Sequence, residues 1–252
     1  MNYTVVIIYC CNRKRELLEL LQSIFNQTIP PSEVIVISDG PAVELRDLEL
    51  NINLIESTKF GRPGPLRNEG IKRSKNDLIF ISDDDDIWHP QKAEFQIRAV
   101  NNDVNVGICF TEKLSFSNVS DVREIKFFKK VNSKRIRLRH LLIRNNLPLS
   151  SCLINRSIIN AEFSLSEEVR GWADYDLWLR EVKFTKIIKV RAPLLFYRSH
   201  SGSMRNGNIQ GMIDSQRQLL MTNYDLGIIE KLLVVIFYWL RSIKWRYSSN
   251  EY

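Results

Sequence analysis

The sequence predicts an α/β protein in which helices flank a mainly parallel β-sheet. Apolar, β-branched runs at residues 3–11, 34–37 and 78–81 are continuous rather than alternating, which is typical of strands buried on both faces. Segments with helical spacing of apolar residues stand between such runs. Strands that alternate with helices imply right-handed crossovers, and therefore neighbouring strands that point the same way.

The first half of the chain carries the clearest pattern. After the strand at residues 3–11, Asn12 is expected to cap a helix whose apolar positions extend to Phe25, and Pro30 with Pro31 ends that unit. The other elements predicted in this half are strands at residues 34–37, 53–56 and 78–81, a turn-rich loop at 61–65 and a helix at 66–74.

The second half is less regular. Its predicted elements are strands at residues 106–111, 149–154, 187–190 and 194–198, a helix at 172–182, a polar loop at 199–208 and a helical tail at 209–252. No internal repeat and no low-complexity linker separates the two halves, so we expect them to share one globule.

The composition is ordinary for a soluble protein with a sizeable core, because 44% of the 252 residues are hydrophobic and 26% are charged. A formal net charge of +7, from 36 Lys and Arg against 29 Asp and Glu, favours an anionic partner. Nucleotide phosphates, nucleic acid and an anionic membrane surface all fit that description, so charge alone does not choose among them.

The four cysteines, Cys10, Cys11, Cys109 and Cys152, form no CxxC pair, which argues against a zinc site. Cys10 and Cys11 belong to an apolar strand pattern and are expected to be buried thiols in a reducing cytosol. The N-terminal region lacks a signal-peptide pattern, and no run reaches the roughly 18 apolar residues of a spanning helix. We therefore expect a cytoplasmic protein.

Four consecutive aspartates, Asp83 to Asp86, follow the apolar run at residues 78–81. Adjacent like charges repel, so a cation is expected to bind them, and the hard ions Mg²⁺ and Mn²⁺ prefer carboxylate oxygens. Open α/β sheets bind ligands at the carboxyl ends of their strands, where this run lies. This position favours metal and phosphate chemistry over a solvated acidic turn.

Seven segments resemble, in order, the motifs of one enzyme family. They are NR at 12–13, SIFNQT at 23–28, EVIVISDG at 33–40, GPLRNEGI at 64–71, DDDDIWHP at 83–90, DYDLWLR at 174–180 and YRSHSGSM at 197–204. Together they look like the inverting family-2 glycosyltransferases of the GT-A fold, over about residues 3–205. The resemblance implies a Rossmann-like GT-A domain at 1–205, with a nucleotide-binding half at 1–105, an acceptor half at 106–205 and a helical tail at 206–252.

The resemblance implies a metal site in the acidic run, with Mg²⁺ or Mn²⁺ as the cofactor. It makes Asp85 the direct metal ligand, places Asp83 at the metal near the sugar or ribose, and adds Asp84 as a donor contact. It also implies that His200 contacts the metal or the diphosphate, although a histidine in a loop is often merely polar. In an extended segment residues two apart point the same way, so Asp83 and Asp85 are expected to face one cation.

The resemblance further assigns Asp39 and Arg67 to the nucleotide and Asp174 to the catalytic base. Taken without the resemblance, each of these residues also fits a purely structural role. Asp39 would form a turn before Gly40, Arg67 would be a surface residue of a helix, and Asp174 would cap a helix. A carboxylate at such a pocket is suited to remove the proton of an attacking hydroxyl.

Three positions depart from the family pattern. Cys11 stands where relatives often have an aromatic residue that faces the base, so uridine recognition does not carry over. Ser38 replaces the first Asp of the usual Asp-Asp-Gly, and Ala173 replaces a Glu often found just before the base. The acidic run and Asp174 are retained, so the enzyme interpretation stands.

Two segments suggest where the acceptor or a membrane binds. Residues 126–144 hold eight Lys or Arg and no acid, which suits a lipid-linked diphosphate or an anionic membrane as well as a solvated surface. The apolar stretch within 228–246 is too short to span a bilayer and is followed by Arg241, Lys244 and Arg246. It is typical of a helix in the membrane interface, and packing on the domain or on a partner is the alternative.

The sequence thus predicts a metal-dependent inverting glycosyltransferase. It moves a sugar from a nucleotide-diphosphate donor to a hydroxyl of a cell-surface glycan or lipid-linked acceptor, in the cytoplasm or at the inner face of its membrane, and binds no nucleic acid. A nucleotidyltransferase and a non-catalytic carbohydrate-binding relative are the alternatives. A nucleotidyltransferase would have a glycine-rich loop after residues 3–11, and this chain has none there. Retention of the acids argues against a non-catalytic relative. No GxGxxG follows a strand, which excludes a dinucleotide-dependent oxidoreductase.

Overall fold

The computed structural model describes residues 1–10, 12–46, 48–58, 61–122, 125–143, 145, 147–166, 172–199, 216–221, 224 and 226–249, with the backbone alone from 241 onwards. The chain forms two compact units. The first is Met1–Ile136 with Leu147–Ser199, and the second is Arg137–Asn146 with His200–Tyr252. The sequence places residues 137–146 in the acceptor half, whereas here they belong with the tail.

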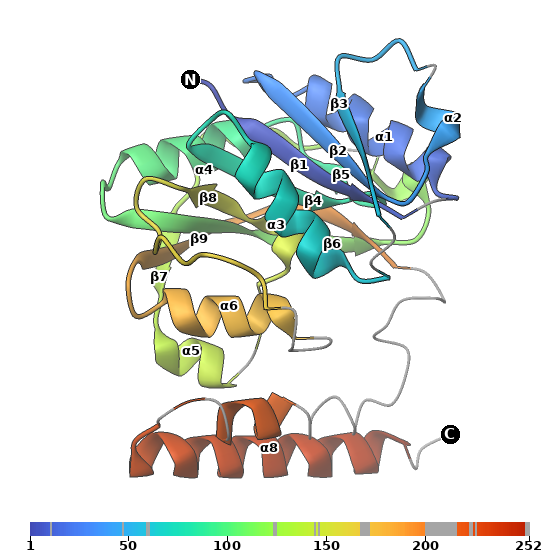
Figure 1. The fold of residues 1–252 in the computed structure, drawn as a ribbon. Coiled ribbons are helices and arrows are strands. Elements are labelled where there is room, and N and C mark those ends of the chain that lie inside the picture. Colours follow the sequence, from blue (N-terminus) through green and yellow to red (C-terminus); the bar gives the residue numbers. More distant parts are fainter. Residues whose placement is uncertain are drawn as a thin grey trace. The chain divides into compact units, whose positions relative to one another are not determined.

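Within the described residues, nine strands of the first unit form one sheet (Figure 1). They are β1 (Thr4–Tyr9), β2 (Glu33–Asp39), β3 (Asn53–Ser57), β4 (Leu78–Asp83), β5 (Ile87–Trp88), β6 (Val106–Phe116), β7 (Ser133–Ile136), β8 (Leu153–Asn155) and β9 (Lys186–Arg198). The order is β3-β2-β1-β4-β8-β6-β9-β5, and β7 pairs with β9. β8 runs antiparallel to β4 and β6, and β5 and β7 run antiparallel to β9, whereas the other pairs are parallel. The predicted mainly parallel sheet is confirmed.

Helices cover both faces of this sheet. They are α1 (Lys14–Phe25), α2 (Val43–Arg46), α3 (Pro63–Arg73), α4 (Lys92–Asn101) and α6 (Ala173–Glu181), with 3₁₀ turns η1 (Val119–Val122) and η2 (Leu149–Ser151). α1 and α4 pack on the face that carries Val5 and Ile7. α3 and α6 lie on the other face, where the Trp178 ring of α6 meets Phe110 at 4.7 Å between centroids (Figure 1). All six residues of β1 are buried, as expected for a strand covered on both sides.

A glycine brings α3 close to the sheet. A Cβ atom built on Gly70 would lie 2.3 Å from Cγ1 of Val6, a branched side chain with little freedom to move. Only glycine therefore allows this helix to approach β1. α3 also begins earlier than the predicted residue 66, because Pro63 suits the first turn of a helix.

Several local predictions were wrong. Asn12 does not cap α1: its φ is 82°, the N-cap position is Arg13, and no side chain caps the helix. Cys10 is exposed rather than buried, because β1 ends at Tyr9. The two strands predicted near the end of the domain form one strand, β9, and the segment predicted as a strand from residue 149 starts with η2.

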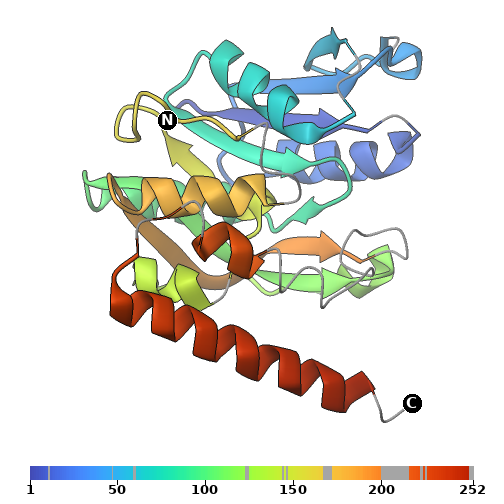
Figure 2. The same cartoon turned by 60° about the horizontal axis from the view of Figure 1, so that its bottom comes forward.

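The second unit contains α5 (Leu138–Ile143) and α8 (Ile228–Ser249), and residues 216–221 are also helical. α5 lies beside α8 (Figures 1 and 2). Val234 and Tyr238 of α8 are buried, at 0% and 1% exposure. In the part of the chain that is described, no helix combines the length and apolarity needed to cross a bilayer.

Candidate active site

The carboxyl ends of β2, β1 and β4 meet at one edge of the sheet. β1 lies between the other two, with Tyr9 opposite Ser38 and Ile8 opposite Asp83. Asp39 is the last residue of β2 and Asp83 the last of β4, so the parallel register brings both acids to this edge. This is the ligand-binding edge of open α/β sheets.

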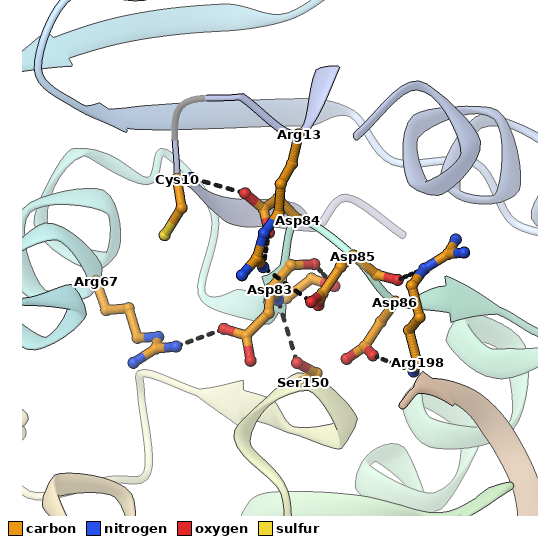
Figure 3. Close-up of polar contacts among 10 residues, drawn as sticks. Cys10, Arg13, Arg67, Asp83, Asp84, Asp85, Asp86, Ser150 and Arg198 are labelled. Atoms are coloured by element: carbon orange, nitrogen blue, oxygen red, sulfur yellow. Dashed lines mark hydrogen bonds and ion pairs between the residues drawn. The ribbon is translucent and has the colours of Figure 1, made fainter. Parts of the chain in front are cut away.

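Asp84 to Asp86 do not continue the strand. β4 ends at Asp83, and Asp84 and Asp85 form a turn, so the predicted extended segment with two carboxylates facing one way is wrong. Three arginines and a serine from distant segments bind this turn (Figure 3). The Asp83 N–H donates to Ser150 Oγ at 3.1 Å, and its carboxylate pairs with Arg67 Nη2.

Asp84 turns inward. It is 1% exposed, its Oδ2 accepts the Cys10 N–H at 2.7 Å, and its Oδ1 pairs with Arg13 Nη1 at 3.0 Å. Burial raises the pKa of Asp84 to about 7, and the Cys10 and Arg13 contacts oppose that rise. The sequence predicts a donor contact for Asp84, but its oxygens bind the loop after β1.

Asp85 faces more open space. Its side chain is 13% exposed, and its Oδ2 lies 2.8 Å from the same Arg13 nitrogen that binds Asp84. Its backbone carbonyl accepts a hydrogen bond from Arg198 Nε at 2.7 Å. Although burial alone would lower the pKa of Arg13, the charges of Asp84 and Asp85 raise it.

Asp86 is buried at the base of the turn. Its Oδ1 accepts the Arg198 N–H at 3.1 Å, and its Oδ2 has no hydrogen-bond partner among the described residues. Burial, and then the charges of Asp83 and Asp85, raise the pKa of Asp86 well above its usual value. Arg198 also pairs with Glu19 of α1 at 2.6 Å, so the end of β9 fixes the turn against α1.

The residues predicted to hold the nucleotide lie beside this turn. Asp39 Oδ2 accepts the N–H of Gly61, in the loop before α3, at 3.1 Å. Arg67 is on α3, one turn further along than predicted, and its side chain is 13% exposed. Its pairing with Asp83 joins α3 to β4, so the structure brings Arg67 to the acidic run at the carboxyl edge of the sheet.

Asp174 lies in the first turn of α6, as predicted, where the helix dipole stabilises a carboxylate. Its Oδ1 accepts the N–H of Tyr175 at 2.7 Å. The segment around η2 links α6 to the acidic run: Trp178 Nε1 donates to the Leu147 carbonyl at 3.2 Å just before η2, and Ser150 within η2 accepts the Asp83 N–H.

His200 lies outside the described residues, as do most of the residues of the predicted loop at 199–208. The contacts of Arg13, Ser150 and Arg198 with the acidic run were not predicted from the sequence. A signal existed for the two arginines, because both stand within the quoted family motifs, but charge alone gave no reason to pair them with the aspartates.

The fold matches solved structures of S. aureus TarS. Against the crystal structure of S. aureus TarS 1–349, the TM-score is 0.64 at 16% identity, with 94% of this chain and 70% of that chain covered. This chain covers 42% of the length of a longer TarS structure. The chain thus has the GT-A fold, as the sequence predicted.

The model of glycosyl transferase family 2 matches residues 5–161. The chain belongs to this family and is a glycosyltransferase. It is 24% identical over 227 residues to an uncharacterized glycosyltransferase, YwdF, of Bacillus subtilis, covering 88% of this chain and 84% of that protein. It is 28% identical over 187 residues to the UDP-Gal:alpha-D-GlcNAc-diphosphoundecaprenol beta-1,3-galactosyltransferase of Escherichia coli, covering 71% of this chain and 66% of that one.

Proposed function

We propose that the protein is a metal-dependent inverting glycosyltransferase that uses a nucleotide-diphosphate sugar. The observation that carries the proposal is the acidic turn, Asp83 to Asp86, at the carboxyl edge of the sheet beside Asp39 and Arg67. TarS structures in complex with UDP and with UDP-GlcNAc support a uridine diphosphate sugar as the first donor to test.

The chemistry of the donor set fits Mg²⁺ or Mn²⁺. Among the described residues, no three His, Cys, Asp or Glu side chains gather into a ready-made metal cage. Mg²⁺ commonly binds through one or two carboxylates and completes its shell with substrate phosphates and water. Asp85, with Asp83, offers such hard oxygen ligands. When bound, the cation stabilises the charge of the departing diphosphate.

Protein residues perform the rest of the proposed reaction. Arg67 and Asp39 hold the nucleotide at the sheet edge, and Asp174 removes the proton of the attacking acceptor hydroxyl. Direct displacement by that hydroxyl inverts the anomeric carbon. The segment that contains η2 links α6 to the acidic turn, because Trp178 of α6 binds Leu147 and Ser150, three residues further on, binds the Asp83 N–H.

Metal-dependent stabilisation tests this proposal. Nucleotide sugars are screened by thermal melting with and without Mn²⁺, because a ligand that binds only the folded state raises its melting temperature. We expect one nucleotide sugar to give a shift that requires Mn²⁺. A shift of equal size without any divalent cation would contradict the metal dependence, and no shift with any donor would contradict the donor class.

The acceptor is proposed to be a cell-surface glycan or a lipid-linked glycan at the inner face of the membrane. The name of the E. coli relative, which includes a diphosphoundecaprenol acceptor, supports a lipid-linked acceptor. The basic run at residues 126–144 adds positive charge, and β7 lies within it.

We further propose that α8 rests in the membrane interface. Opposite its buried residues Val234 and Tyr238, α8 exposes eight large apolar side chains, at 44–79% exposure. They are Ile228, Ile229, Leu232, Leu233, Val235, Ile236, Trp239 and Leu240. An ordinary surface helix carries polar residues there, and the basic positions 241, 244 and 246 at the end of the helix suit anionic lipid.

Replacing Leu232, Ile236 and Trp239 together with glutamine should weaken binding to anionic vesicles. These three side chains lie at helical spacing on the exposed side, so the change removes apolar burial but leaves the buried side of α8 intact. Co-sedimentation at low and high salt measures the effect, and binding of the unchanged protein should fall with salt.

The matched control replaces Val104, Leu114 and Phe184 with glutamine, three exposed apolar residues of the first unit. It should sediment like the unchanged protein. Equal sedimentation of both triple variants would assign α8 to a protein contact instead of a membrane.

A further inference from the structure

We propose that Arg13 is an exchangeable counterion of the metal-binding carboxylate. Before the donor binds, Arg13 pairs with Asp85 Oδ2. When a divalent cation occupies that oxygen, Arg13 releases it and binds the diphosphate of the donor instead. This inference rests on the proposed metal site at Asp85 and deepens it, because it explains how Asp84 and Asp85 share one counterion while Asp85 still accepts a metal.

The two contacts of Arg13 differ in kind. One nitrogen, Nη1, lies 3.0 Å from Asp84 Oδ1 and 2.8 Å from Asp85 Oδ2 (Figure 3). The Asp84 side chain is 2% exposed, and its other oxygen is already held by the Cys10 N–H. The Asp85 side chain is 13% exposed. The Asp84 contact is therefore a fixed anchor, and the Asp85 contact lies on the open side.

A divalent cation at Asp85 competes directly with Arg13. Both are positively charged and both bind the Asp85 carboxylate, so a cation at Asp85 would repel the Arg13 guanidinium from Asp85 Oδ2. The Arg13 side chain is 37% exposed and has room to turn. A guanidinium carries five N–H donors, so Arg13 can keep its bond to Asp84 and direct other N–H groups elsewhere.

The diphosphate of the donor is the new partner for those N–H groups. Asp85 would hold the cation, and a cation that also attracts the substrate phosphates would favour a diphosphate beside the Arg13 guanidinium. Arginine binds phosphate oxygens in a two-point geometry. The diphosphate thus attracts both cations that compete for Asp85, and its binding should be positively coupled to that of the metal.

Exchanging Arg13 for methionine should move two affinities in opposite directions. Mn²⁺ alone should bind roughly fivefold more tightly, because a competing ion pair is gone. A nucleoside diphosphate at saturating Mn²⁺ should bind about tenfold more weakly, because charge-assisted hydrogen bonds are lost. Free Mn²⁺ is measured by electron paramagnetic resonance, and UDP binding by calorimetry. A purely structural role of Arg13 would weaken both.

Arg15→Met is the matched control. Arg15 lies two residues away, is 83% exposed and pairs with Glu19 Oε1, so this variant loses the same charge without a direct contact to the acidic turn, and Glu19 keeps its pairing with Arg198 through Oε2. Neither affinity should change. Because Arg13→Met also leaves the buried Asp84 without its cation, melting temperatures are compared first, and Arg13→Lys provides a second variant that keeps the charge but lacks the two-point geometry. It should show weaker UDP binding and nearly unchanged Mn²⁺ binding.

The outcomes separate this inference from the proposed function. If the unchanged protein binds Mn²⁺ and Arg13→Met binds it equally well, Arg13 does not compete for Asp85 and the exchange is wrong. If UDP binds but Mn²⁺ does not bind to any variant, the metal site itself is wrong and the exchange falls with it. Opposite shifts in Arg13→Met with an unchanged Arg15→Met support the exchange.

Discussion

Replacing Asp174 with asparagine should lower the turnover number by a factor on the order of 10² or more, while donor affinity stays nearly unchanged. Asparagine keeps the shape of the side chain and the hydrogen bond from the Tyr175 N–H but no longer accepts a proton. Steady-state kinetics with the donor found in the melting screen, together with calorimetric donor binding, measures both quantities.

The control for this prediction is Asp176→Asn, the same chemical change two residues further along α6. Asp176 is 7% exposed and pairs with Arg180 Nε at 3.0 Å, so its loss should lower the melting temperature rather than turnover per folded molecule. If turnover and donor affinity fall together in Asp174→Asn, Asp174 is a binding or structural residue and not the base.

Asp85→Asn should abolish metal-supported donor turnover with little loss of stability. A neutral amide is a poor ligand for a hard cation, and the buried contacts of the turn belong to Asp84 and Asp86, which stay in place. Calorimetry of Mn²⁺ together with a nucleoside diphosphate should show a large loss of metal affinity.

Asp77→Asn is the control for Asp85→Asn. Asp77 immediately precedes β4 and is 65% exposed, so the variant removes one carboxylate at the opposite end of the same strand. It should bind Mn²⁺ like the unchanged protein. Undiminished Mn²⁺ affinity in Asp85→Asn would refute Asp85 as the metal ligand.

The helix α4 shows why sequence patterns fail locally. No element is predicted from the sequence at residues 92–101, where apolar residues alternate at 93, 95 and 97. In the structure Lys92 and Gln96 are fully buried in this helix. Gln96 Nε2 donates to the carbonyls of Cys109 and Ser151, and Lys92 Nζ lies 3.8 Å from the Trp88 ring centroid. Polar residues in core positions hide the helical period, because only their tertiary partners make their burial favourable.

By itself, the sequence determined the parallel sheet, the strand that leads into the four aspartates, and the helix that begins near Asp174. Continuous apolar runs and helical spacing are local signals, and the carboxyl end of a strand is known once the strand is known. The metal role of Asp85 and the base role of Asp174 stay predictions with defined tests.

Only the tertiary structure decided how the acids are arranged and neutralised. Arg13, Arg67 and Arg198 come from three distant parts of the chain, and no spacing rule relates them to the aspartates. Because of the turn after β4, Asp83 pairs with Arg67 whereas Asp85 pairs with Arg13. Asp84 is buried and accepts a hydrogen bond from the loop after β1. Charge is visible in a sequence, but its partner and its exposure depend on packing, because both are set by contacts between segments far apart in the chain.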